Sequence, residues 1–233
     1  LKVTVVESHS IAGGCAHSFD REGFTFDSGP SLWAGLSRPS VNPLRQVLDA
    51  IGEADTIEWA TYDGWGMILP EDDFYFRTGD AASWERTMER LGGASASSEW
   101  KQLMDFVAPV ITASSATPPI VLRSDPLVLL PLLRCAGGLL QAAPHARFLN
   151  GPFSELLDAA GMPGQGFVRA WLDYLAFALS GLDCRGTLGA AVAFTLGDLY
   201  RPGATLDYPI GGARSVIEAL ARGLIKRGGT LRT

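Results

Sequence analysis

The chain has 233 residues, of which 47% are hydrophobic, and its formal net charge is −6. This apolar content suffices for a packed core in one large or two modest domains, and it excludes a disordered chain. Nucleic-acid partners are not expected, because such binding needs an electropositive face and the sequence has no basic cluster. The three cysteines have unrelated spacings and predict neither a disulfide framework nor a metal site, which indicates a reducing compartment: Cys15, Cys135 and Cys184.

The chain opens with a β-branched run, Lys2 to Val6, that ends at an acid, Glu7. This pattern predicts a buried parallel strand whose carboxyl end meets a ligand. In dinucleotide-binding α/β folds a carboxylate at such a strand end accepts hydrogen bonds from ribose hydroxyls. Gly13 and Gly14 follow, and their backbone can approach a charged ligand closely.

The next segment predicts a hairpin. Two strand-like pieces, Ser18 to Phe19 and Phe24 to Phe26, flank a turn at Glu22-Gly23. A second close backbone approach is expected at Gly29, and Pro30 stiffens it.

A helix is expected next, between Ser40 and Gly52. Asn42 is its N-cap, Pro43 its first residue and Gly52 its stop. We expect the apolar residues of one face to point inward: Leu44, Val47, Leu48 and Ile51.

A second hairpin is expected within residues 59–77, with its turn at Glu71-Asp72, and the pattern then becomes helical. Asp80 and Ser98 are expected to cap two helices, and Pro109 to break the second. Further helices are predicted at Phe153 to Ala160, Phe167 to Leu182, Thr187 to Tyr200 and after Gly211-Gly212, and a last strand at Thr230 to Thr233. The helix from Phe167 is apolar nearly all round, as expected for a central helix that lines an apolar cavity.

The segment from Asp125 to Ala143 is the most apolar part of the chain, and its uncharged parts are shorter than the ~20 residues that span a bilayer. Two interpretations remain open. It forms either a buried helix pair around a kink or a surface that dips into one membrane leaflet.

Two motifs carry a family resemblance. The first motif resembles the second half of the FAD site of amine-oxidase-like flavoproteins. It consists of Glu7, five residues, Gly13-Gly14, the hairpin and then Phe26-Asp-Ser-Gly-Pro-Ser31. Tyr208-Pro-Ile-Gly-Gly resembles the segment that returns from the substrate domain in the same superfamily. The branch that the chain resembles most is that of phytoene desaturases and carotenoid cis-trans isomerases.

The resemblance implies a discontinuous α/β Rossmann-like FAD-binding domain with an inserted, mainly helical substrate domain of the α+β class. The FAD domain comprises residues 1–61 and 208–233, and the substrate domain residues 62–207. The usual Gly-x-Gly-x-x-Gly turn is expected just before Leu1, so that the chain is expected to be a fragment. The cofactor-binding residues that the resemblance implies are Glu7, Ser8, Gly13, Gly14, Cys15, Gly29, Pro30 and Ser31.

The implied activity is carotenoid isomerisation, with poly-cis lycopene as an example of the polyene substrate. The alternatives are a desaturase, a retinol saturase-like reductase or a truncated chain without catalysis. No catalytic side chain and no metal are predicted, since FAD would carry the chemistry. Cys15 replaces the arginine that usually faces the FAD pyrophosphate, and His17 is left open as a phosphate-side residue. The family also implies a plastid location, with membrane contact through residues 125–143.

Overall fold

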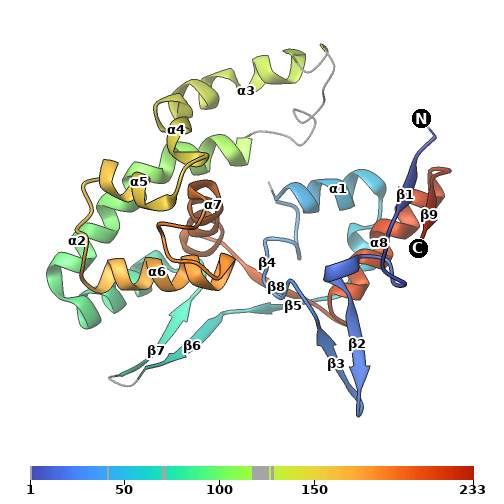
Figure 1. Cartoon of the computed structure of the whole chain (residues 1–233), viewed down its shortest axis with the longest axis horizontal. Coiled ribbons are helices and arrows are strands. Elements are labelled where there is room, and N and C mark those ends of the chain that lie inside the picture. The colour runs from blue at the N-terminus through green and yellow to red at the C-terminus, as the bar shows by residue number, and fades with distance from the viewer. Residues whose placement is uncertain (1, 41, 70–71, 117–125, 127–128) are drawn as a thin grey trace. The chain divides into compact units, whose positions relative to one another are not determined.

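The computed structural model describes residues 2–40, 42–69, 72–116, 126 and 129–233. The chain divides into two compact units, which Figure 1 labels by element. Unit 1 comprises Leu1–Asp63 and Thr205–Thr233, and unit 2 comprises Gly64–Ala204. The assignment of cofactor binding to the first unit and substrate binding to the second stays a prediction.

The first and last strands of unit 1 pair with each other. β1 (Thr4–Val6) is parallel to β9 (Thr230–Arg232), and the amide of Glu7 donates to the carbonyl of Arg232 at 2.8 Å. The expectation of a buried strand is wrong, since Val6 is 76% exposed. The physical reason is that β1 and β9 form a sheet of two strands, which covers neither face.

The predicted hairpin is confirmed. β2 (Ser18–Arg21) and β3 (Phe24–Asp27) are antiparallel. Both turn residues have positive φ, 53° at Glu22 and 84° at Gly23, as a tight two-residue hairpin turn requires.

A three-stranded sheet has β8 (Leu206–Pro209) between β4 (Trp33–Ala34) and β5 (Trp59–Tyr62). Asp207 of β8 is fully buried. Its carboxylate accepts the amides of Leu36 and Ser37 at 2.8 and 2.9 Å and the hydroxyl of Thr61 at 2.8 Å. This one side chain therefore satisfies donors from both sides of the central strand.

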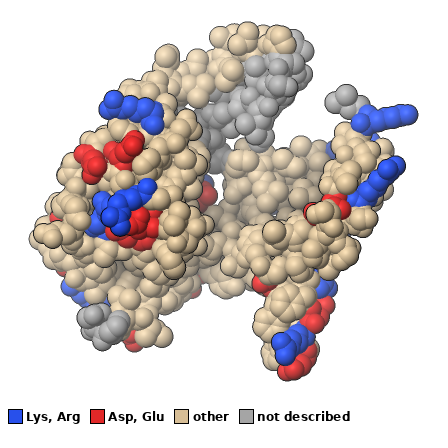
Figure 2. All heavy atoms as spheres, viewed as in Figure 1, with Lys and Arg blue, Asp and Glu red and all other residues tan. Residues whose placement is uncertain are grey.

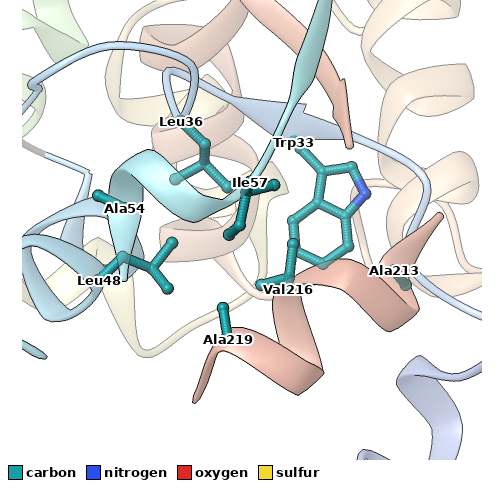
Figure 3. Packing of buried hydrophobic residues seen from close by; sticks show 8 residues of the cluster. All are labelled: Trp33, Leu36, Leu48, Ala54, Ile57, Ala213, Val216 and Ala219. Atoms are coloured by element: carbon teal, nitrogen blue, oxygen red, sulfur yellow. The ribbon is translucent and has the colours of Figure 1, made fainter. Parts of the chain in front are cut away.

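Two helices pack beside this sheet. α1 (Pro43–Ile51) begins as predicted, with the Asn42 side chain accepting the amide of Leu44, and ends at Gly52 with φ 73°. The short helix η2 (Ala54–Thr56) follows, and α8 (Ala213–Lys226) packs against α1. Their shared core is drawn in Figure 3 and consists of Trp33, Leu36, Leu48, Ala54, Ile57, Ala213, Val216 and Ala219.

The inward face of α1 differs from the prediction at two positions. Val47 is 39% exposed, whereas Arg45 is buried. The Arg45 guanidinium donates to the carbonyl of Leu36 and pairs with Asp49, both at 2.9 Å. A charged side chain can lie at the core boundary because these partners satisfy it.

Unit 2 begins with the second hairpin, β6 (Gly64–Ile68) and β7 (Asp73–Arg77), and Glu71 of the turn predicted at Glu71-Asp72 lies outside the described residues. α2 (Ala81–Ala116) follows, with Asp80 accepting the amide of Ser83 as a cap. The helix breaks at Gly93, where φ is 79°.

The predicted division into two helices is confirmed, with the break at Gly93, but two details of the second helix are wrong. Ser98 is not a cap, because its hydroxyl donates to the carbonyl of Ser95 within the helix. Pro109 lies inside α2 and does not end it. Packing explains the continuation, since Val107 and Val110 on either side are buried.

The rest of unit 2 is helical. Its elements are α3 (Leu129–Ala142), η5 (Ala143–His145), α4 (Ala146–Leu149), α5 (Phe153–Ala159), α6 (Phe167–Ser180) and α7 (Gly189–Tyr200). The core centres on Trp84, whose ring lies 4.9 Å from that of Trp171 and 5.0 Å from that of Phe76. α6 has one buried face and one exposed face, with Phe177 62% exposed.

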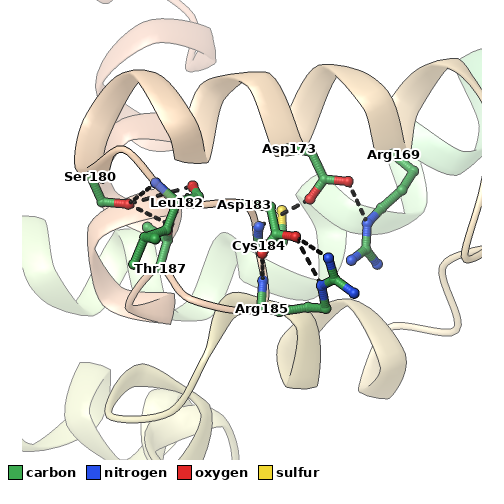
Figure 4. A network of polar contacts seen from close by, with 8 residues as sticks. All are labelled: Arg169, Asp173, Ser180, Leu182, Asp183, Cys184, Arg185 and Thr187. Carbon is green, nitrogen blue, oxygen red and sulfur yellow. Dashed lines mark hydrogen bonds and ion pairs between the residues drawn. The ribbon is translucent and has the colours of Figure 1, made fainter.

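A polar network holds the loop after α6, as Figure 4 shows. Asp173 accepts the amide of Cys184 at 3.0 Å and pairs with Arg169 at 3.2 Å. Thr187 donates to the carbonyl of Leu182 at 2.9 Å. The loop is thereby fixed by side chains of α6 and by its own threonine.

Candidate functional site

The candidate cofactor site begins where β1 ends. The Glu7 side chain is half-buried, and its Oε1 accepts the amide of His9, two residues ahead, at 2.9 Å. The Ser8 hydroxyl lies 3.5 Å from the same oxygen. This short loop holds the carboxylate in place and leaves lone pairs for a further donor.

Gly13 and Gly14 form the turn that faces Glu7. Both have positive φ, 99° and 52°. A Cβ on Gly14 would lie 2.9 Å from Glu7 Oε2, and one on Gly13 would lie 2.8 Å from Ile217 of α8. The two glycines therefore allow the turn to pass between the strand-end carboxylate and the helix.

Gly29 brings the second segment of the site against the first. A Cβ there would lie 2.2 Å from the carbonyl oxygen of Cys15, which leaves no space for any other residue. The Ser28 hydroxyl donates to the same carbonyl at 3.3 Å. Cys15 is exposed at this point of contact.

His17 is part of the same cluster. Its Nδ1 lies 2.7 Å from the carbonyl oxygen of Gly14 and 3.0 Å from the hydroxyl of Ser28. The Gly14 carbonyl can only accept, so Nδ1 carries the proton and Nε2 is the acceptor in the neutral ring. The ring stacks on His9 with a centroid distance of 5.0 Å.

Asp27 links the hairpin to the first turn of α8, and sequence reasoning missed this role. Its Oδ1 accepts the Ser18 hydroxyl at 2.7 Å and the amide of Ala213 at 2.8 Å. Its buried Oδ2 has no hydrogen-bond partner among the described residues. Burial, followed by the Asp27 charge, raises the pKa of Tyr208.

The structure brings most of the predicted residues together. Glu7, Ser8, Gly13, Gly14, Cys15 and Gly29 form one contiguous cluster. Pro30 and Ser31 are exposed and continue the chain past it. The polar residues of the hairpin were the signal that could have pointed to Asp27 and Ser18. The partner of Asp27 is the amide of Ala213, which lies 186 residues away in the sequence.

Unit 2 contains a cavity of about 540 Å³ between α2 and the end of α7. Its walls combine apolar residues such as Trp100 and Met104 with the charged side chains of Glu85, Lys101 and Asp105. The central α6 residues expected to line a cavity do not line this one. Trp171 and Leu175 are buried in the core, so the apolar stripe of α6 fills the unit.

Comparison with known proteins gives a family match for the first segment. Residues 1–51 match a family described as the NAD(P)-binding Rossmann-like domain. A crystal structure of a Pyrococcus furiosus protein superposes with a TM-score of 0.50 over 99% of this chain and 44% of that one, at 14% identity. This second likeness concerns the fold alone.

Two proteins of known name are similar in sequence to this chain. The chain is 26% identical to human all-trans-retinol 13,14-reductase over 182 residues, 75% of this chain and 28% of that protein. It is 42% identical to the chloroplastic prolycopene isomerase of Daucus carota over 52 residues, 22% of this chain and 8% of that protein. The chain thus spans less than a third of these relatives. By their names, the first of these relatives acts on a retinoid and the second on a carotene, and the family match covers the nucleotide-binding segment alone.

Proposed function

We propose that the protein is a FAD-dependent oxidoreductase of long polyenes and that it isomerises a poly-cis carotene. The observation that carries the cofactor assignment is the Glu7 carboxylate, held at the carboxyl end of β1 against the Gly13-Gly14 turn. A carboxylate in this place suits a ribose hydroxyl of a dinucleotide. The Rossmann-like match covers these same residues.

The residues present fit such a cofactor. Glu7 would accept from the ribose, and the exposed backbone around Cys15 would approach the phosphates without an arginine. Asp27 Oδ2 is a buried acceptor without a donor among the described residues, which a hydroxyl or N–H group of the cofactor would satisfy. When bound, FAD supplies electron and hydride transfer, and the protein's part is to bind, orient and exclude water.

A retinoid reductase is the second candidate, since the human retinol reductase aligns with 75% of this chain. The substrate in both cases is a long, largely apolar polyene, whose binding gains about 25 cal/mol per Å² of apolar area buried. A plastid location rests on the family resemblance and remains part of the proposal.

The test uses the purified protein with FAD and a reductant. Poly-cis lycopene and all-trans-retinol are offered separately in liposomes, and the products are separated by chromatography. All-trans lycopene with an unchanged number of double bonds supports isomerisation, new double bonds under oxidising conditions support desaturation, and a dihydroretinol supports reduction. Retention of FAD without any product would contradict the polyene assignment. Failure to bind FAD would contradict the cofactor assignment.

A further inference from the structure

Two histidines stack beside the glycine turn of unit 1. The rings of His9 and His17 have a centroid distance of 5.0 Å and an interplanar angle of 27°. Both Nδ1 atoms are held by the backbone: the Ile11 amide donates to His9 Nδ1 at 3.1 Å, and His17 Nδ1 lies 2.7 Å from the Gly14 carbonyl oxygen. Neither Nε2 atom has a hydrogen-bond partner among the residues that the structure describes.

The two rings differ in the position of their proton. A backbone amide can only donate, so His9 Nδ1 accepts, and Nε2 carries the proton in the neutral ring. In His17 the proton lies on Nδ1, because the Gly14 carbonyl can only accept, and Nε2 has a free lone pair. His9 is therefore a hydrogen-bond donor while it is uncharged. His17 donates through Nε2 only after it takes up a second proton.

A positive charge on this pair belongs on His17. Protonation of His17 at Nε2 leaves the hydrogen bond from Nδ1 to the Gly14 carbonyl intact. Protonation of His9 would place a proton on Nδ1, facing the Ile11 amide, and the hydrogen bond between them would be lost. Charges on both rings would repel one another at a centroid distance of 5.0 Å. The pair is therefore expected to carry one charge, on His17.

The arginine of α8 that reaches the hairpin is already paired. Arg214 lies 3.0 Å from the carboxylate of Asp20 and donates to the carbonyl of Ser18 at 3.0 Å. In Figure 2, positive and negative side chains lie next to one another at the free end of the hairpin. Cys15, in the place of the usual arginine, carries no cation. The two imidazoles therefore supply N–H donors and, on His17, a charge.

We propose that this histidine pair binds the diphosphate of the cofactor, with His9 as a neutral donor and His17 as the ring that takes up a proton on binding. The proposal rests on the proposed FAD binding and adds a pH dependence to it. Phosphate oxygens accept hydrogen bonds from N–H groups, and a bond from a charged donor is roughly twice as strong as one from a neutral donor. Since histidine changes its charge between about pH 5 and pH 8, FAD should bind more tightly as the pH falls through this range.

The test measures the Kd of FAD for the full-length protein at about pH 5.5 and about pH 7.5 by flavin fluorescence. Carboxyl groups titrate below this range and thiols and guanidinium groups above it. The other titratable groups around the pair should therefore contribute little: Glu7, Cys15, Asp20, Asp27 and Arg214. The parent should bind FAD roughly tenfold more tightly at the lower pH. The Kd of adenosine, measured by displacement of FAD, should be equal at both pH values because adenosine has the ribose but no diphosphate.

Two asparagine variants separate the roles of the rings. His17→Asn keeps an N–H group for the Gly14 carbonyl but lacks Nε2, so it should bind FAD about tenfold more weakly than the parent at the lower pH and show no pH dependence. His9→Asn keeps an oxygen that accepts the Ile11 amide. It should weaken FAD binding about two- to tenfold at both pH values and retain the pH dependence. His145→Asn, in η5 of unit 2, is the matched control and should behave as the parent does.

Circular dichroism and an unchanged Kd of adenosine should show that each variant is folded and keeps the ribose contact. Equal Kd values of FAD for the parent at both pH values would overturn the proposal, as would a pH dependence that survives in His17→Asn. An unchanged Kd of FAD in His9→Asn would remove His9 from the site. A parent that binds no FAD at either pH would contradict the cofactor assignment and this proposal together, whereas FAD binding without pH dependence would contradict this proposal alone.

Discussion

Glu53 is a fully buried carboxylate that holds the loop after α1 to the last turns of α8. It accepts from Arg222 at 3.0 Å and from Lys226, and both cations are partly exposed. The hydrogen bond from Lys226, followed by that from Arg222, lowers the pKa of Glu53. The charged form is therefore favoured by folding.

This pKa shift predicts a pH-dependent stability. Glu53→Gln should lower the urea midpoint at neutral pH, because two cations lose their charged partner. A carboxylate whose pKa is lower in the folded than in the unfolded protein stabilises the fold at pH values above its ordinary pKa of about 4.3. This stabilisation is lost as the pH falls through the pKa of the folded protein. The difference between parent and variant should thus shrink below about pH 4. A difference that stays constant from pH 7 to pH 3 would contradict the role of its charge.

Glu7 provides the residue-scale test of the cofactor site. In the full-length protein, Glu7→Gln should weaken FAD binding by about 1.5–3 kcal/mol, or roughly one to two decades in Kd, because the amide loses a charge-assisted hydrogen bond. Flavin fluorescence titration measures the Kd. Glu22→Gln is the control, since Glu22 lies in the exposed hairpin turn. Equal Kd values for parent and Glu7→Gln would remove Glu7 from the site.

The two described free thiols should react differently. Burial, followed by the neighbouring Asp173 carboxylate, raises the pKa of Cys184, so its reactive thiolate is suppressed. Cys15 is exposed. Iodoacetamide should label Cys15 in the folded protein and Cys184 only after denaturation, as peptide mass spectrometry would measure. Equal labelling of both in the folded protein would be the contrary result.

At the scale of elements, the start of α8 depends on a close contact with the β2–β3 hairpin. Gly212 has φ 77°, and a Cβ there would lie 2.5 Å from Asp27 Oδ1 and 2.6 Å from Ser18 Oγ. Ala213 donates its amide to the same Asp27 oxygen. The hairpin and the helix therefore meet through backbone that only glycine can supply.

Gly212→Ala should destabilise unit 1 by more than the ~1–3 kcal/mol of backbone strain alone, because the added methyl group also displaces Asp27. Gly23→Ala is the control, since Gly23 has φ 84° but open space around it. Urea unfolding compares the two. If Gly212→Ala and Gly23→Ala lowered the free energy of unfolding equally, the close contact with Asp27 would make no contribution to the loss.

Local signals in the sequence predict where helices and strands begin and end better than they predict which neighbours bury them. The caps of α1 and the turn at Glu22-Gly23 could be predicted because neighbouring residues determine them. The exposure of β1 could not, since it depends on which strands pair with it. A proline usually breaks a helix, but packing on both sides of Pro109 keeps this part of α2 helical. At the site, Glu7 and the glycine pair are local, whereas the Asp27–Ala213 contact joins distant segments.

At the scale of the whole molecule, two units with separate cores predict selective effects of core substitutions. Trp84 is 1% exposed and lies at the centre of the aromatic core of unit 2. Trp84→Ala should cost unit 2 about 3–5 kcal/mol through lost contacts and a cavity. Hydrogen exchange should show faster exchange in α2, α6 and α7, with the slowest amides of α8 unchanged. Equal acceleration in α8 would show that the chain unfolds as one cooperative unit.

The pairing of β1 with β9 also has a consequence for the order of folding. Thr4 aligns with Thr230, so unit 1 cannot be completed until residue 230 has been synthesised. Closing the intervening loop of unit 2, if unfolded, would cost about 4 kcal/mol of chain entropy. Unit 2 removes most of this cost, because Gly64 pairs with Arg77 and the amide of Gly203 donates to the carbonyl of Gly79. The two ends of unit 2 are thereby fixed near each other. We therefore expect unit 2 to fold first and to lower the entropic cost of closing unit 1.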